Sequence, residues 1–179
     1  DTDNEIFSIG NEDCEYLVYS GEERGSINIT KLNSDYLETI EAHDNTIEKV
    51  LLSRDGRYIV TASERGTLIR LFNLETKELL KEFRRGCDPV KIVDLCLSDD
   101  NSVLLVGSEK GTIHLFNTCL NDDYDQKNKH WNKYGMKYIK GVLPEYFSSE
   151  WSFAQVYLSN TDTHTWIDSV EKKLYTFGN

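Results

Sequence analysis

The chain has 179 residues, with 31 acidic and 20 basic side chains and a formal net charge of −11. This length suffices for one domain with a hydrophobic core, and the acidic balance argues against binding to nucleic acid through a broad basic surface. No apolar run approaches the ~20 residues of a membrane-spanning helix, so a soluble chain is predicted. Because the sequence begins at Asp1 and ends at Asn179 inside a repeat, we expect it to be a fragment of a larger domain.

The cysteine pattern predicts no metal centre. Four cysteines are widely spaced, without a CxxC motif or a nearby pair of histidines: Cys14, Cys87, Cys96 and Cys119. Neither a zinc cluster nor a disulfide framework follows from this pattern, and buried thiols in a reducing cytosol are the expectation. No cofactor is predicted.

The first predicted elements are two short β-rich runs. Residues 15–20 (EYLVYS) and 26–30 (SINIT) are joined by residues 21–25, which resemble a hairpin connection. Helix signals are nearly absent further along the chain. This pattern predicts an all-β protein.

A longer unit then occurs twice. Residues 52–73 match residues 97–117 at an offset of 45 up to Thr112 and of 44 after it, so one residue is gained or lost in the last strand, as a bulge would do. The first hairpin is a weaker copy, and residues 173–176 start a plausible fourth. A period of ~40–45 residues with several short strands is typical of WD40-like β-propeller blades. The blade-like repeats are expected at about 5–40, 41–83, 84–158 and 159–179, within one domain.

A short basic motif separates the two longest repeats. A predicted strand over residues 78–83 leads into Phe83-Arg84-Arg85-Gly86. Successive strand side chains point to opposite faces, so Arg84 and Arg85 are expected to enter different surroundings, and each guanidinium can grip a phosphate in a bidentate fork. This motif resembles the FRRG signature of the PROPPINs, β-propellers that bind phosphoinositides.

The resemblance implies a fold and two binding sites. It covers most of the chain from about Tyr16 onward, and it implies the C-terminal half of a seven-bladed propeller, here about three blades and part of a fourth. On the family template each arginine closes one phosphoinositide pocket on the propeller rim. The first predicted site comprises His43, Ser63, Thr67, Arg70 and Arg84. The second predicted site comprises Arg85, Ser108, Lys110, Thr112 and His114.

The residue types in these two sites suit a phosphorylated inositol ring. Hydroxyls at a glycine-flanked turn, backbone N–H groups, a histidine and an arginine provide many donors. Alternatives remain open: Ser-x-x-Gly-Thr can be an ordinary hairpin turn, and the two arginines can be a solvated strand end. His43 can form a hydrogen bond between blades, and Arg70 can form a surface ion pair with Glu64 or Glu41. His114 lies where the preceding repeat has Arg70, and its protonation is expected to strengthen binding below neutral pH.

An insertion of about 34 residues follows Asn117, and a strand is expected after it at 152–158. Its middle, residues 127–140, has five lysines and no acid, and the resemblance implies that this loop contacts the bilayer. A disordered polar loop is the alternative. The predicted membrane-contacting residues are Lys127, Lys129, Trp131, Lys133, Tyr134, Met136, Lys137, Tyr138, Ile139 and Lys140.

The function implied is that of a peripheral, cytoplasmic membrane effector. The resemblance implies recognition of phosphatidylinositol 3-phosphate or the 3,5-bisphosphate on endosomal, vacuolar or preautophagosomal membranes, a role in autophagy or traffic, and protein partners. The alternative is a WD40 scaffold that binds proteins without lipid specificity. An enzyme is not predicted, because the sequence has no paired-carboxylate spacing, no nucleophile elbow and no phosphate-binding glycine loop.

Overall fold

The computed structural model describes residues 7–9, 15–118, 120, 149–157, 163–168 and 173–178, the last two ranges as backbone. All regular elements in these ranges are β-strands. Within the same ranges, no helix is long and apolar enough to cross a bilayer. The predicted membrane-contacting residues between 127 and 140 lie outside the described residues.

The first sheet is formed by the hairpin predicted near the N-terminus and the strands on either side of it. Its strands, in antiparallel order, are β1 (Phe7–Ile9), β2 (Tyr16–Ser20), β3 (Ser26–Lys31) and β4 (Leu37–Glu41). In β3 the side chains of Ile27 and Ile29 are fully buried, whereas that of Asn28 is half-buried, as expected of a strand with one face in the core.

The two long repeats form the second and third sheets. The second contains β5 (Ile47–Leu52), β6 (Tyr58–Ser63), β7 (Leu68–Asn73) and β8 (Leu79–Arg84), with the short β12 (Glu150–Trp151) parallel to the end of β8. The third contains β9 (Ile92–Leu97), β10 (Val103–Ser108), β11 (Thr112–Asn117) and β13 (Ala154–Tyr157). A further hairpin joins β14 (Thr163–Asp168) to β15 (Lys173–Gly178).

The one-residue difference between the repeats does not create a bulge inside the last strand. Pairing is continuous from Tyr58↔Asn73 to Ala62↔Ile69 in the second sheet, and from Val103↔Asn117 to Gly107↔Ile113 in the third. The extra residue of the first repeat therefore lies in the β6–β7 connection. There it lengthens the turn and leaves the pairing of β6 with β7 unchanged. The register shifts instead at Ile47/Lys49 of β5, at Gly107/Ser108 opposite β9, and at Leu71/Phe72 of β7 where it pairs with β8.

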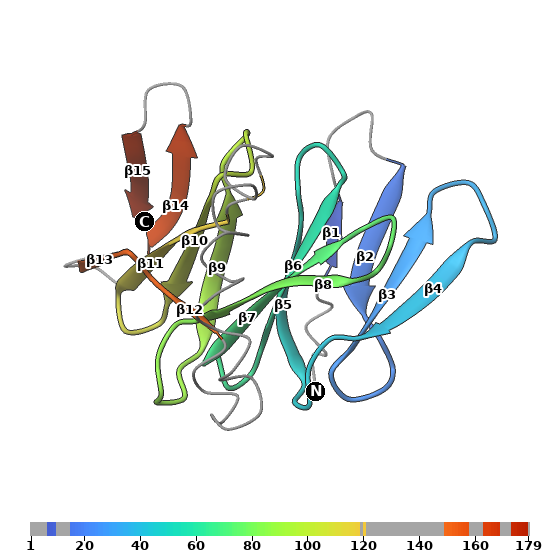
Figure 1. Ribbon diagram of the computed structural model, residues 1–179, viewed down its shortest axis with the longest axis horizontal. Coiled ribbons are helices and arrows are strands. Elements are labelled where there is room, and N and C mark those ends of the chain that lie inside the picture. Colours follow the sequence, from blue (N-terminus) through green and yellow to red (C-terminus); the bar gives the residue numbers. More distant parts are fainter. Residues whose placement is uncertain are drawn as a thin grey trace, which may run out of the picture.

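The sheets stand side by side and bury their faces against each other, as propeller blades do (Figure 1). One core cluster joins the first and second sheets through residues such as Ile29 and Phe72. The other joins the second and third sheets through residues such as Leu71, Phe83 and Phe116. The apolar core therefore lies between successive sheets, and the chain segments that connect two sheets run along its edge.

Turns at one end of the sheets also pack against the neighbouring sheet. In the second sheet Gly66 N donates to Ser63 O at 2.8 Å, and in the third Gly111 N donates to Ser108 O at 3.0 Å, so the two β-turns match. Gly66 has a φ of +58°, and a Cβ there would lie 2.0 Å from Val90 O. Only glycine allows the β6–β7 turn to pack this closely on the segment that leads into β9.

Candidate functional site

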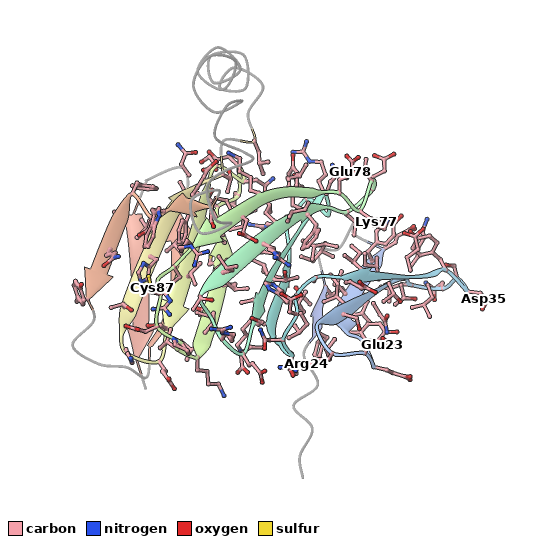
Figure 2. All side chains as sticks on the ribbon, turned by 60° about the horizontal axis from the view of Figure 1, so that its bottom comes forward. Glu23, Arg24, Asp35, Lys77, Glu78 and Cys87 are labelled. Atoms are coloured by element: carbon pink, nitrogen blue, oxygen red, sulfur yellow. The ribbon has the colours of Figure 1, made fainter. Side chains whose placement is uncertain are left out.

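The Phe83-Arg84-Arg85-Gly86 motif lies where the chain passes from the second sheet to the third. The Phe83 side chain is fully buried and packs on Phe116 of β11, with ring centroids 5.2 Å apart. Arg84 is the last residue of β8, only 9% exposed, and its backbone pairs with Leu68 on one side and Trp151 on the other. In Figure 2, Lys77 and Glu78 lie near the start of β8, and Cys87 lies on the connection beyond its end. The side chain of Cys87 is exposed, so the expectation of a buried thiol is wrong for this residue. Phe83 thus anchors the two arginines between the sheets.

Arg85 lies beyond the strand end and beside the β6–β7 turn. Its backbone N donates to Thr67 O at 3.0 Å, its Nε donates to Gly66 O at 3.0 Å, and its guanidinium also donates to Asp88 O. Burial lowers the pKa of Arg85 below its ordinary value, although a guanidinium stays charged at neutral pH. The structure therefore holds this positive charge at the turn that carries Thr67.

Arg70 of the first predicted site is held in a half-buried ion pair. Its Nε donates to Glu82 Oε2 at 2.9 Å, and its Nη1 donates to Ala42 O at 2.7 Å. Arg70 thus forms an ion pair, as the alternative interpretation had it, but the suggested partners Glu64 and Glu41 were wrong. The β7–β8 register places Arg70 directly opposite Glu82, which decides the pairing, and Glu64 instead contacts Arg24 at 3.4 Å.

His43 has an internal partner between the first two sheets. Its imidazole is 8% exposed, and its Nε2 lies 2.9 Å from Thr61 Oγ1 in β6. Burial, followed by the charge of Arg70, lowers the pKa of His43 to about 4. His43 is therefore neutral at physiological pH, and it lies close to Arg70 while forming the inter-blade hydrogen bond considered as an alternative.

His114 of the second predicted site lies near Arg85 and is also neutral. The imidazole is 4% exposed, and its Nδ1 lies 3.3 Å from Ser152 Oγ. Burial, followed by the charge of Arg85, lowers the pKa of His114 to about 4. In the free protein His114 is therefore neutral between pH 8 and pH 6, which does not support the expected strengthening of binding in that range.

The remaining predicted residues lie at the two matched turns. Ser63 ends β6 and Thr67 follows the turn, while Lys110 is exposed in the β10–β11 turn. Ser108 Oγ and Thr112 Oγ1 are hydrogen-bonded at 2.6 Å. The structure thus places Arg70 near His43 and Arg85 near His114, and it also bonds Arg85 to the turn of the first predicted site that carries Thr67.

Three polar residues near these sites were not predicted from the sequence. Glu82 is bonded to Arg70, Ser149 Oγ donates to Glu82 Oε1 at 3.0 Å, and Ser152 contacts His114. Glu82 could have been found, because it lies two residues before Arg84 on the same strand. The serines could not, because they come from the far side of the insertion and no local pattern marks them.

Comparison with known proteins decides the family. The family model described as PROPPIN matches residues 4–151. The chain belongs to the PROPPIN family. This confirms the resemblance inferred from the motif and the repeats, and it agrees with the all-β, propeller-like arrangement of the sheets.

Similar PROPPINs are found among fungal proteins. The chain is 37% identical over 152 residues to SVP1-like protein 2 of Kluyveromyces lactis, covering 78% of this chain and 42% of that protein. It is 41% identical over 110 residues to Autophagy-related protein 18 of Debaryomyces hansenii, covering 62% of this chain and 19% of that protein. The chain thus spans less than half the length of these curated relatives.

Solved structures show the same fold. Kluyveromyces lactis Hsv2 aligns with a TM-score of 0.66 and 28% identity over 97% of this chain and 60% of that chain. A structure titled as a complex of KlAtg21 with the coiled-coil of AgAtg16 aligns with a TM-score of 0.56 and 28% identity over 63% of this chain and 39% of that chain. The sheets described here therefore correspond to part of a larger β-propeller.

Proposed function

We propose that this PROPPIN is a non-enzymatic effector that binds phosphatidylinositol 3-phosphate, the 3,5-bisphosphate, or both, on endosomal, vacuolar or preautophagosomal membranes. Its role is in autophagy or vesicular traffic, as the name of the similar Autophagy-related protein 18 suggests. Family membership supports the class of ligand, and the residues around Arg84 and Arg85 supply the chemistry.

The observation that carries this proposal is that the structure places an arginine near a histidine on each side of the motif. On one side Arg70 lies near His43, and on the other Arg85 lies near His114. Arg85 is bonded to the glycine turn that carries Thr67, and the matched turn of the next sheet carries Thr112, two residues before His114. A chain of net charge −11 needs such local concentrations of donors to hold an anion.

The proposed chemistry is that of charge-assisted hydrogen bonds. Arginine and lysine donors to phosphate oxygens contribute roughly 1.5–3 kcal/mol each, so a few donors suffice for selective binding of a head group. The neutral histidines would act as hydrogen-bond donors and not as charges. The two sites differ, because Arg70 already shares its charge with Glu82, whereas the bonds of the Arg85 guanidinium go to backbone carbonyls.

The test is vesicle co-sedimentation with the full-length protein. We expect binding to phosphatidylcholine vesicles that contain phosphatidylinositol 3-phosphate, partial loss in Arg84→Thr and Arg85→Thr, and complete loss in the double variant. Lys31→Thr is a matched control, because Lys31 pairs with Glu15 on the first sheet, away from the motif. A folded double variant that still sediments as the parent does would contradict the proposal.

A protein-binding scaffold is a second candidate that can coexist with the first. It is favoured by the similar structure whose title names a complex with a coiled-coil. If lipid binding is absent from the parent protein but a coiled-coil partner is retained by it on a column, the scaffold role is the better description.

A further inference from the structure

One short segment, residues 149–153, contacts both predicted sites. After Ser149, β12 runs parallel to Phe83 and Arg84, and Lys81 Nζ bonds Glu150 Oε1 at 2.6 Å. The chain then leaves the second sheet and joins the third, where Phe153 N donates to Leu115 O at 2.9 Å. In Figure 1 this segment crosses from β8 to β11 and continues as β13. The strand expected at 152–158 is β13, which begins at Ala154, and β12 lies before it on the other sheet.

At the first site the segment acts on Arg70 through a carboxylate. Glu82 uses one oxygen, Oε2, to accept from Arg70 Nε, and the other, Oε1, to accept from Ser149 Oγ at 3.0 Å. Ser149 is buried, so its hydroxyl has little access to water as an alternative partner. Without this donor, Oε1 of Glu82 would accept a hydrogen bond from another N–H group of Arg70. Fewer guanidinium N–H groups would then remain to bind a phosphate.

At the second site the segment acts on His114. A neutral imidazole has one N–H, and a phosphate dianion accepts hydrogen bonds but does not donate them. Nδ1 of His114 faces Ser152, so His114 can donate a hydrogen bond to a phosphate only from Nε2. Nε2 must then carry the proton, and Nδ1 must accept a hydrogen bond. The hydroxyl of Ser152, 3.3 Å from Nδ1, can donate to that nitrogen and so favours this tautomer.

We propose that Ser149 and Ser152 are positioning residues, one for each phosphate site, through which a single segment orients the donors of both. Ser149 fixes the carboxylate that holds Arg70, and Ser152 fixes the tautomer of His114. This inference rests on the proposed function, because it concerns how those two sites are prepared for their ligand.

The experiment measures each site separately by calorimetric titration of the full-length protein with soluble inositol 1,3-bisphosphate. The first site is isolated in an Arg85→Thr background and the second in an Arg84→Thr background. A hydrogen bond worth about 1 kcal/mol predicts a ~5-fold loss of affinity. We expect Ser149→Ala to cause this loss only at the first site, and Ser152→Ala only at the second.

Further variants separate positioning from a general structural role. Ser152→Thr keeps the hydroxyl and should restore second-site affinity, and Ser149→Ala should have no additional effect in a Glu82→Ala background. Ser34→Ala, an exposed serine in the β3–β4 loop, is the matched control. Thermal unfolding checks that all variants are folded.

The outcomes distinguish this inference from the function on which it rests. Equal losses at both sites from either serine variant, or no loss from both, would overturn the positioning roles alone. If the parent protein binds neither the soluble head group nor vesicles, the proposed function falls, and this inference with it.

Discussion

Phe83 and Phe116 meet across the interface of the second and third sheets, with ring centroids 5.2 Å apart and both side chains buried. The aromatic residue of the motif is therefore a structural anchor, whereas the two arginines that follow it are the candidates for ligand binding. Sequence alone cannot separate these roles, because all three residues belong to one short motif.

The first prediction concerns this anchor. Phe83→Ala should lower the free energy of unfolding by roughly 3–5 kcal/mol, because it removes a fully buried ring and leaves a cavity. Urea denaturation of the full-length protein measures the change. Phe153→Ala is the control: Phe153 is 62% exposed, and a change below about 0.5 kcal/mol is expected. Similar losses in both variants would contradict the anchoring role.

A second prediction compares two glycines near the sites. Gly66→Ala should be strongly destabilising, because its positive φ disfavours a side chain and the new Cβ would meet Val90 O. Gly86→Ala should fold normally, because a Cβ there meets nothing within 4 Å. Melting temperatures test both. If Gly86→Ala folds but loses vesicle binding, Gly86 is needed for close approach of the ligand.

The two neutral histidines predict a pH dependence of stability. The folded pKa of His43 and of His114 is about 4, below the ordinary value of 6.5, so between these values the unfolded chain binds more protons. Stability should therefore be full above pH 6.5 and fall as the pH drops toward 4, with a slope of up to about 1.4 kcal/mol per pH unit for each histidine. Denaturation curves at several pH values measure this slope.

The variant His114→Asn tests how much of this pH dependence of stability comes from His114. In His114→Asn the contribution of one histidine is lost, so the stability of the variant should vary less with pH than that of the parent over this window. The lowered pKa values of Asp55 and Asp100 act at more acidic pH, below their ordinary value of 3.8. An identical slope in variant and parent would show that His114 is not buried in its neutral form.

The lysine-rich insertion gives the last prediction. Residues 127–147 lie outside the described ranges, so the membrane role of this part is a hypothesis from the sequence. Replacing residues 127–147 with a Gly-Ser linker should reduce vesicle retention more than affinity for soluble inositol 1,3-bisphosphate, because the lysines are drawn to anionic lipid at about 1 kcal/mol each. An equal loss in both assays would indicate a structural role, and unchanged retention an inert loop.

The sequence by itself determined the family and the fold class. The repeat of about 45 residues predicted blade-like units, since alternating apolar residues and glycine turns are local features that one blade reproduces in the next. The motif at Phe83-Arg84-Arg85-Gly86 identified the PROPPIN family, because its residues are contiguous. The lysine-rich part of the insertion, in a chain that is acidic as a whole, is also visible in the sequence alone.

Only the tertiary structure decided the partners of the charged and polar groups. The register of β7 on β8 places Arg70 opposite Glu82, so the two form an ion pair. Burial between the sheets lowers the pKa of His43 and His114, so both are neutral. Ser149 and Ser152 reach the two sites after a long insertion, a pairing that no local pattern encodes. Local sequence patterns determine which strands form, whereas the packing of distant strands determines which side chains meet and whether water reaches them.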